Sequence, residues 1–123
     1  MKSVLVVEDD EANRALVAKY LKREGYRVLF AQDGLRGVEL AQAETPDLIL
    51  MDLELPELNG WEATRRIKAD PATSHIPVLV LTAHALQTDV VNAANAGCDD
   101  YEAKPVSYGR LMQKVNRFLD ASN

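Results

Sequence analysis

Three carboxylates and a hydroxyl follow short apolar segments of this sequence, and an ammonium follows a weaker, more polar segment. They are Glu8, Asp9, Asp52, Thr82 and Lys104. If those segments are parallel strands of one sheet, their carboxyl ends deliver all five side chains to the edge where open α/β sheets bind ligands. Any one of them alone is more simply a solvated charge or a helix cap, so the prediction rests on their joint occurrence.

The crowding of three carboxylates at one edge predicts a bound cation. At an effective dielectric constant near 20, two like charges about 4 Å apart repel by roughly 4 kcal/mol. Either some of Glu8, Asp9 and Asp52 stay protonated at neutral pH, or a cation lies among them. Oxygen ligands on a partly open edge suit Mg²⁺, which keeps several waters and takes one or two carboxylates directly. Zinc and copper prefer softer ligands than these.

A magnesium ion facing a lysine and a hydroxyl is suited to phosphoryl transfer, which mainly requires positioning and charge neutralisation. A carboxylate can be the nucleophile and form an aspartyl phosphate. We predict Asp52 as this phosphoacceptor, because the apolar segment 48–51 before it fixes it centrally. Asp9 would hold the metal, and Glu8 would act beside it or through water. Lys104 would supply a compact positive charge and Thr82 a hydrogen bond.

The elements that must position these residues alternate between two hydrophobic periods. Runs rich in Val, Leu and Ile predict buried parallel strands at residues 4–7, 28–30, 48–51 and 78–81, with a weaker strand at 100–103. Helical patterns fall between and after them, at residues 12–24, 35–43, 61–68, 86–96 and 108–119. The faces predicted to be buried include Leu16 and Leu35. Right-handed crossovers then predict a three-layer α/β sandwich.

The bulk properties predict one cytoplasmic domain. The chain has 123 residues, no apolar run approaching the roughly 18 residues of a membrane helix, and no signal-peptide pattern. A net charge of -5 with scattered basic residues disfavours direct binding to nucleic acid. Cys98 is the only cysteine, which excludes an internal disulfide, and we expect it to be a buried structural residue.

Four motifs resemble the receiver domain of bacterial response regulators, and the resemblance covers the whole chain. They are the opening strand with its acidic pair at 4–10, the phosphoacceptor strand and loop at 46–56 with Gly60, and the segments 76–83 and 96–105. The resemblance implies a flavodoxin-like, CheY-like sheet of five parallel strands in the order 2-1-3-4-5, with five helices. It also implies a stand-alone domain over residues 1–123 without an output domain, as in the single-domain members CheY and DivK.

The resemblance also implies the roles of the site residues. Asp52 would receive a phosphoryl group from a histidine kinase or a histidine phosphotransfer protein. Mg²⁺ would be bound by Asp9, Asp52 and the backbone carbonyl of Glu54, with Glu8 assisting. A cis peptide bond before Pro105 would aim Lys104 at the site.

Phosphorylation would then be transmitted by a conformational switch. In the family, the residue matching Thr82 moves toward the phosphoryl group and the residue matching Tyr101 turns inward, which biases a two-state surface. Tyr101 has a second interpretation, as an aromatic edge that packs without switching. A downstream effector protein would bind the face formed by the fourth helix, fifth strand and fifth helix. We expect a monomer or weak dimer.

Two features are particular to this sequence. Glu54 and His84 stand two residues after Asp52 and Thr82, at positions that tune phosphoryl lifetime in the family. The predicted fourth helix is nearly uncharged and leaves Val91 outward, which suggests a docking face, although an Ala-rich helix without a partner explains the pattern equally well.

Rival functions remain open from the sequence. A receiver-fold scaffold that does not use phosphorylation would not need the complete site. A magnesium-dependent phosphatase of the haloacid dehalogenase type would need an aspartate two residues after its nucleophile, where this chain has Glu54, and a cap domain for which there is no room. A flavodoxin-like electron carrier is disfavoured because no phosphate-binding loop follows the first strand. A direct switch and a phosphorelay intermediate cannot be distinguished.

Overall fold

The chain folds around one parallel sheet with helices on both faces. The computed structural model describes residues 1–55, 58–83 and 95–120. The five strands lie in the order β2-β1-β3-β4-β5, and every neighbouring pair is parallel. Their bounds are β1 Ser3–Val7, β2 Arg27–Ala31, β3 Leu48–Asp52, β4 Val78–Thr82 and β5 Asp100–Ala103. This order is the predicted one.

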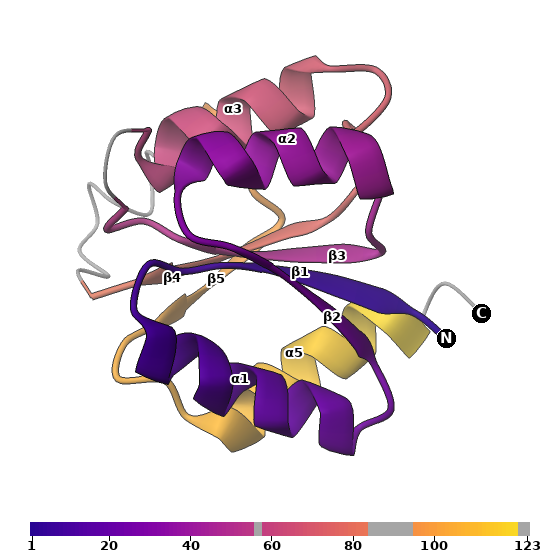
Figure 1. Cartoon of the computed structure of the whole chain (residues 1–123), viewed down its shortest axis with the longest axis vertical. Coiled ribbons are helices and arrows are strands. Elements are labelled where there is room, and N and C mark those ends of the chain that lie inside the picture. The colour runs from indigo at the N-terminus through magenta and orange to yellow at the C-terminus, as the bar shows by residue number, and fades with distance from the viewer. Residues whose placement is uncertain (56–57, 84–94, 121–123) are drawn as a thin grey trace.

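The helices form the two outer layers of the sandwich (Figure 1). In the described part of the chain these are α1 Glu11–Arg23, α2 Gly34–Glu44, α3 Gly60–Ala69 and α5 Tyr108–Asp120. Helices α1 and α5 cover one face of the sheet, and α2 and α3 cover the other. The predicted three-layer α/β architecture is therefore confirmed. The helix predicted at residues 86–96, including its outward Val91, lies almost wholly outside the described residues.

The central strands are apolar on both faces because each face is covered by helices. Along β1 and β3, successive side chains alternate between two separate cores. Leu5 and Ile49 belong to the core under α2 and α3. Val4 and Leu50 belong to the core under α1 and α5. Because each fully buried Leu or Val contributes about 1.5–3 kcal/mol, these strands hold their carboxyl ends firmly in place.

Strand β2 departs from the predicted burial on both faces. It lies at an edge of the sheet and pairs only with β1. Phe30 is 42% exposed, and of the strand only Ala31 is fully buried. The apolar run at 28–30 resembled a central strand because its composition does not reveal which strand has a single neighbour.

Leu16 and Leu35, which belong to the predicted faces of the first two helices, are exposed. The predicted faces are otherwise confirmed where helix α1 buries Val17 and Leu21, together with Ala18, and where helix α2 buries Val38 and Ala41. Helix α2 approaches the sheet through Gly37, where a Cβ atom would lie 2.9 Å from Val7 Cγ2. A helix packed this closely turns its small residues inward and its larger Leu35 outward.

Cys98 is half-buried rather than buried, which corrects the prediction for that residue. Burial is the largest cause that raises the pKa of its thiol to about 11, and the charges of Asp99 and Asp100 add to it. The thiol therefore stays protonated at neutral pH, as expected for an unreactive structural cysteine.

Both ends of helix α1 are determined by local features of the chain. Asp10 caps α1, accepting a hydrogen bond from Ala12 N at 2.9 Å. Gly25 follows α1 with a φ of 89°, a conformation that favours glycine. Asp10 is thus used for capping and leaves the chemistry to its neighbours. Among the residues described here, no helix combines the length and the apolar composition that crossing a membrane requires.

Candidate functional site

Strand alignment brings the predicted site residues to one edge of the sheet. Asp52 is the last residue of β3 and is in register with Leu81 of β4. Thr82, the last residue of β4, is in register with Ala103 of β5. Lys104 follows directly, and its backbone N–H donates to the carbonyl of Thr82 at 2.7 Å. Parallel pairing therefore fixes the end of each strand relative to the next.

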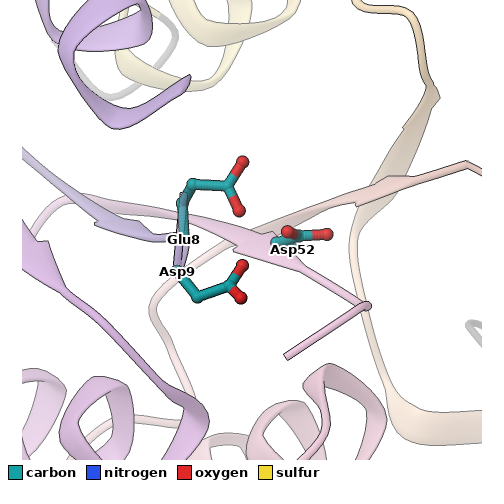
Figure 2. A group of neighbouring side chains, drawn as sticks. All are labelled: Glu8, Asp9 and Asp52. Carbon is teal, nitrogen blue, oxygen red and sulfur yellow. The ribbon is translucent and has the colours of Figure 1, made fainter. Parts of the chain in front are cut away.

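The three predicted carboxylates converge on one point (Figure 2). Each of Glu8, Asp9 and Asp52 offers an oxygen atom, and these oxygens all lie within 4.8 Å of one another. Asp52 is only 2% exposed and Glu8 only 6%, whereas Asp9 is open to solvent. Two of the carboxylates are therefore buried, and the cluster is accessible to solvent at Asp9.

Asp52 is a buried carboxylate, and its neighbours shift its pKa in opposite directions. Its Oδ1 accepts hydrogen bonds from Lys104 Nζ at 2.8 Å and from the backbone N–H of Glu54 at 3.1 Å. Burial is the main cause that raises the pKa of Asp52, and the neighbouring Glu8 raises it further, against the opposing effects of Lys104 and Glu54. A cation in the cluster would favour the charged form of Asp52.

Lys104 is the positive partner of this cluster. Burial is the largest single influence and lowers its pKa, but Asp52, Glu8 and Glu54 together outweigh it, so the pKa of Lys104 is raised overall. The ammonium is therefore charged at neutral pH. The peptide bond between Lys104 and Pro105 is cis, the geometry that the resemblance implies.

Glu54 is exposed, but its carboxylate contacts residues of the site. One carboxylate oxygen, Oε1, accepts a hydrogen bond from the backbone N–H of Ala83 at 3.1 Å. The other, Oε2, lies 3.5 Å from Lys104 Nζ. His84, the other predicted tuning residue, lies outside the described residues.

The two predicted switch residues occupy neighbouring strands. Thr82 is buried at the end of β4, beside Lys104. Tyr101 lies in β5 with its ring partly exposed. Lys114 of α5 donates to the carbonyl oxygen of Tyr101 at 2.6 Å, and its ammonium lies 5.7 Å from the centre of the Tyr101 ring. Lys114 thus interacts with both the backbone carbonyl and the aromatic ring of Tyr101.

Arg14 is a site residue that the sequence reasoning missed. Its Nη1 donates to the backbone carbonyls of Glu8 and Asp9, at 2.9 and 3.4 Å. It thereby fixes the loop that carries both acids. Its position one helical turn after the N-cap of α1 could have suggested a side chain reaching back to this loop.

A cavity of about 280 Å³ lies next to the site. Its charged walls are Glu8 and Lys104, and polar and apolar residues complete it. The full lining is Glu8, Asn13, Val17, Leu81, Lys104, Pro105, Val106 and Tyr108. One lining residue, Tyr108, stacks its ring on that of Tyr20.

The donor set fits a hard divalent cation. Three carboxylates supply only oxygen ligands, and the exposed Asp9 leaves room for water, which Mg²⁺ retains. Within the described residues, this is also the only group of three or more acidic, His or Cys side chains close enough to share a metal ion.

Comparison with known proteins agrees with this geometry. Residues 4–116 match the response regulator receiver domain family. The chain is 39% identical to the polar-differentiation response regulator DivK of Brucella anthropi over 118 residues, covering 96% of each chain. The same identity and coverage hold for DivK of Brucella ovis.

Solved structures show the same fold. The receiver domain of the sensor histidine kinase PA1611 from Pseudomonas aeruginosa matches with a TM-score of 0.89 and 39% identity, over 97% of this chain and 98% of that one. That structure holds a magnesium ion in its active-site cleft. A CheY-like receiver protein from Methanospirillum hungatei matches with a TM-score of 0.89 and 31% identity, over 98% and 95% of the two chains. On its sequence match and its fold together, the chain belongs to the response regulator receiver domain family.

Proposed function

We propose that this protein is a signalling switch that accepts a phosphoryl group on Asp52 from a histidine kinase or a histidine phosphotransfer protein. The observation that carries the proposal is the position of Asp52. It is 2% exposed, hydrogen-bonded to Lys104 at 2.8 Å, and grouped with Glu8 and Asp9. A buried carboxylate between a lysine and two further acids is an uncommon arrangement for a structural residue.

The reaction transfers one phosphoryl group between two side chains. A carboxylate oxygen of Asp52 attacks the phosphorus atom of the donor phosphohistidine and forms a new P–O bond. The P–N bond to the imidazole breaks, and the leaving nitrogen keeps the electron pair and later takes a proton. Lys104, already 2.8 Å from Asp52, would neutralise charge on the phosphoryl oxygens. Thr82, at the end of the adjacent strand, would donate a hydrogen bond to one of them.

The residues that would hold magnesium are Asp9, Asp52 and the backbone carbonyl of Glu54, with Glu8 supporting them. Bound there, the ion would neutralise negative charge on the transferring group. Arg14 would keep the loop of Glu8 and Asp9 in place through their carbonyls. The exposure of Asp9 would allow the ion to enter from solvent.

Output would depend on protein contacts. Phosphorylation would draw Thr82 toward the phosphoryl group and turn Tyr101 inward, changing the face formed by β5, α5 and the segment between β4 and β5. A downstream effector protein would bind that face, and nucleic acid would not be contacted directly.

We place the protein in the cytoplasm as a monomer or weak dimer. Glu54 and His84 would tune the phosphoryl lifetime. It would act as a phosphoacceptor, assisting only its own phosphorylation and dephosphorylation.

Intact-mass spectrometry after incubation with acetyl phosphate and Mg²⁺ tests the proposal. The expected result is a mass gain of one phosphoryl group on the wild-type protein, and none on Asp52→Asn. Asp47→Asn, which removes an acid that instead bonds Ser3 at the opposite end of the sheet, should still be labelled. A folded wild-type protein that gains no mass from any phosphodonor would favour the scaffold, and steady turnover of a phosphomonoester would favour the phosphatase.

A further inference from the structure

The carboxylate of Glu54 is held by two donors, the backbone N–H of Ala83 and the ammonium of Lys104, which also contacts Asp52. It is 41% exposed, yet both of its oxygens are used. Oε1 accepts from the backbone N–H of Ala83 at 3.1 Å, and Oε2 lies 3.5 Å from Lys104 Nζ. Its own backbone N–H donates to Asp52 Oδ1 at 3.1 Å, so the side chain starts from a fixed point. These contacts hold the Glu54 side chain in one position, whereas a glutamate surrounded only by water would have no fixed position.

Both donors also face the position where a phosphoryl group would lie. Lys104 Nζ is 2.8 Å from Asp52 Oδ1, so an atom bonded to that carboxylate would be close to the ammonium. Ala83 follows Thr82 at the end of β4, the strand paired with β3 at Asp52. The Ala83 N–H is therefore presented at the same sheet edge. A phosphoryl group carries about two negative charges and strong acceptor oxygens, which require such donors.

We propose that the Glu54 carboxylate is an internal anion that occupies the phosphoryl-binding donors, Lys104 and the Ala83 N–H, while Asp52 is unphosphorylated. This inference rests on the proposed function and adds a mechanism of regulation to it. A phosphodonor must displace the carboxylate from both donors before transfer. Once transfer has occurred, the displaced carboxylate is an anion next to the phosphoryl group. Glu54 thus favours the unphosphorylated protein.

The size of the effect follows from the two contacts that are lost. One is a backbone hydrogen bond and the other a partly exposed ion pair at a distance longer than a strong hydrogen bond. Interactions of these kinds change an equilibrium constant by about two- to tenfold. Removing the carboxylate should therefore strengthen binding of a phosphoryl analogue by about two- to tenfold.

The test compares Glu54→Ala, Glu54→Gln and Glu54→Asp in a beryllofluoride titration with Mg²⁺, followed by the NMR signal of the Ala83 amide. Glu54→Ala should lower the beryllofluoride concentration at the midpoint by about two- to tenfold, and Glu54→Gln by less, because its amide oxygen can still accept from Ala83. Before beryllofluoride is added, Glu54→Ala should shift the Ala83 amide signal. Glu11→Gln removes an exposed acid at the start of α1 and should titrate like wild type.

Glu54→Asp separates occupation of the donors from simple repulsion of anions. It keeps the negative charge but is one methylene shorter, so it cannot reach both Ala83 and Lys104. A midpoint close to that of Glu54→Gln supports the internal anion. A midpoint equal to wild type means that charge alone acts and overturns the inference, as does an Ala83 signal unchanged in Glu54→Ala. If wild type neither binds beryllofluoride nor is labelled at Asp52, the proposed function fails and the inference fails with it.

Discussion

At the scale of single residues, the site depends on how closely its backbone segments approach one another. The loop after β3 returns toward the sheet at Gly60, the first residue of α3. A Cβ atom at Gly60 would lie 2.4 Å from the carbonyl oxygen of Asp52 and 2.8 Å from Leu53 Cα. Both are backbone atoms, which cannot rotate away as a flexible side chain can. Gly60 therefore supports the position of Asp52 without contacting any ligand.

Substituting Gly60 by alanine should destabilise the protein. The added methyl group must displace the backbone at Asp52, and we expect a loss of about 2–4 kcal/mol in the free energy of unfolding. Urea denaturation followed by circular dichroism measures it. Gly109→Ala is the matched control, because nothing lies within 4 Å of a Cβ at that helical position. The control should be neutral or more stable by up to about 1 kcal/mol, and equal stability of the two variants would contradict the close approach.

At the scale of elements, β5 is attached to α5 by a network of charges. Lys114 reaches Glu102 at 3.3 Å and Asp100 at 3.5 Å, in addition to the carbonyl of Tyr101 at 2.6 Å. Arg117 bonds Asp100 at 2.9 Å. Glu102 is buried, and its ion-pair partners are Lys114 and, at 3.6 Å, Arg110. This edge strand, which carries Tyr101, is thus held by its pairing with β4 and by these polar contacts to α5.

Replacing Lys114 by methionine should weaken this attachment. The change leaves the buried Glu102 with only the more distant Arg110 among the ion pairs described, and we expect a loss of about 1–3 kcal/mol in the free energy of unfolding. Chemical denaturation gives the value, and faster hydrogen exchange in β5 would locate the effect. Arg65→Met is the control, because its ion pair with Glu62 is exposed and contributes at most about 1 kcal/mol. A Lys114 variant as stable as this control would show that β5 does not depend on the network.

At the scale of the whole molecule, the acidic cluster links metal binding to stability. The chain carries a net charge of -5, and three of its carboxylates meet at one end of the sheet. Glu8 and Asp9 follow β1 and Asp52 ends β3, two strands that separate when the protein unfolds. A divalent ion held at this cluster would therefore bind only the folded state, and any such ligand stabilises folding by mass action.

Magnesium should raise the free energy of unfolding. At a free concentration about ten times the dissociation constant, the gain is about 1.4 kcal/mol, visible as a higher melting temperature at constant ionic strength. Asp9→Asn removes the exposed carboxylate of the cluster and should abolish most of the gain. Glu39→Gln, an acid of α2 outside the cluster, should keep it. A gain that survives in Asp9→Asn would point to binding elsewhere on the surface.

Much of the fold could be predicted because each element is encoded locally. The runs at 4–7, 48–51 and 78–81 are apolar at every position, which only a strand covered on both faces requires. Strand ends follow from the same runs, so the positions of Glu8, Asp52 and Thr82 at one edge could be inferred from the sequence. The end of α1 is also local, because Gly25 follows it in a backbone conformation that favours glycine.

What the tertiary structure alone decided depends on contacts between distant segments. The sequence could not reveal that β2 lies at the sheet edge with Phe30 exposed, because edge position depends on which strands pair. Nor could it show that Glu54 reaches Ala83 and Lys104, or that Arg14 holds the loop of the acids. Hydrophobic periodicity predicts which face of a single helix or strand is buried. The partner of a polar side chain is determined only when separate elements have packed together.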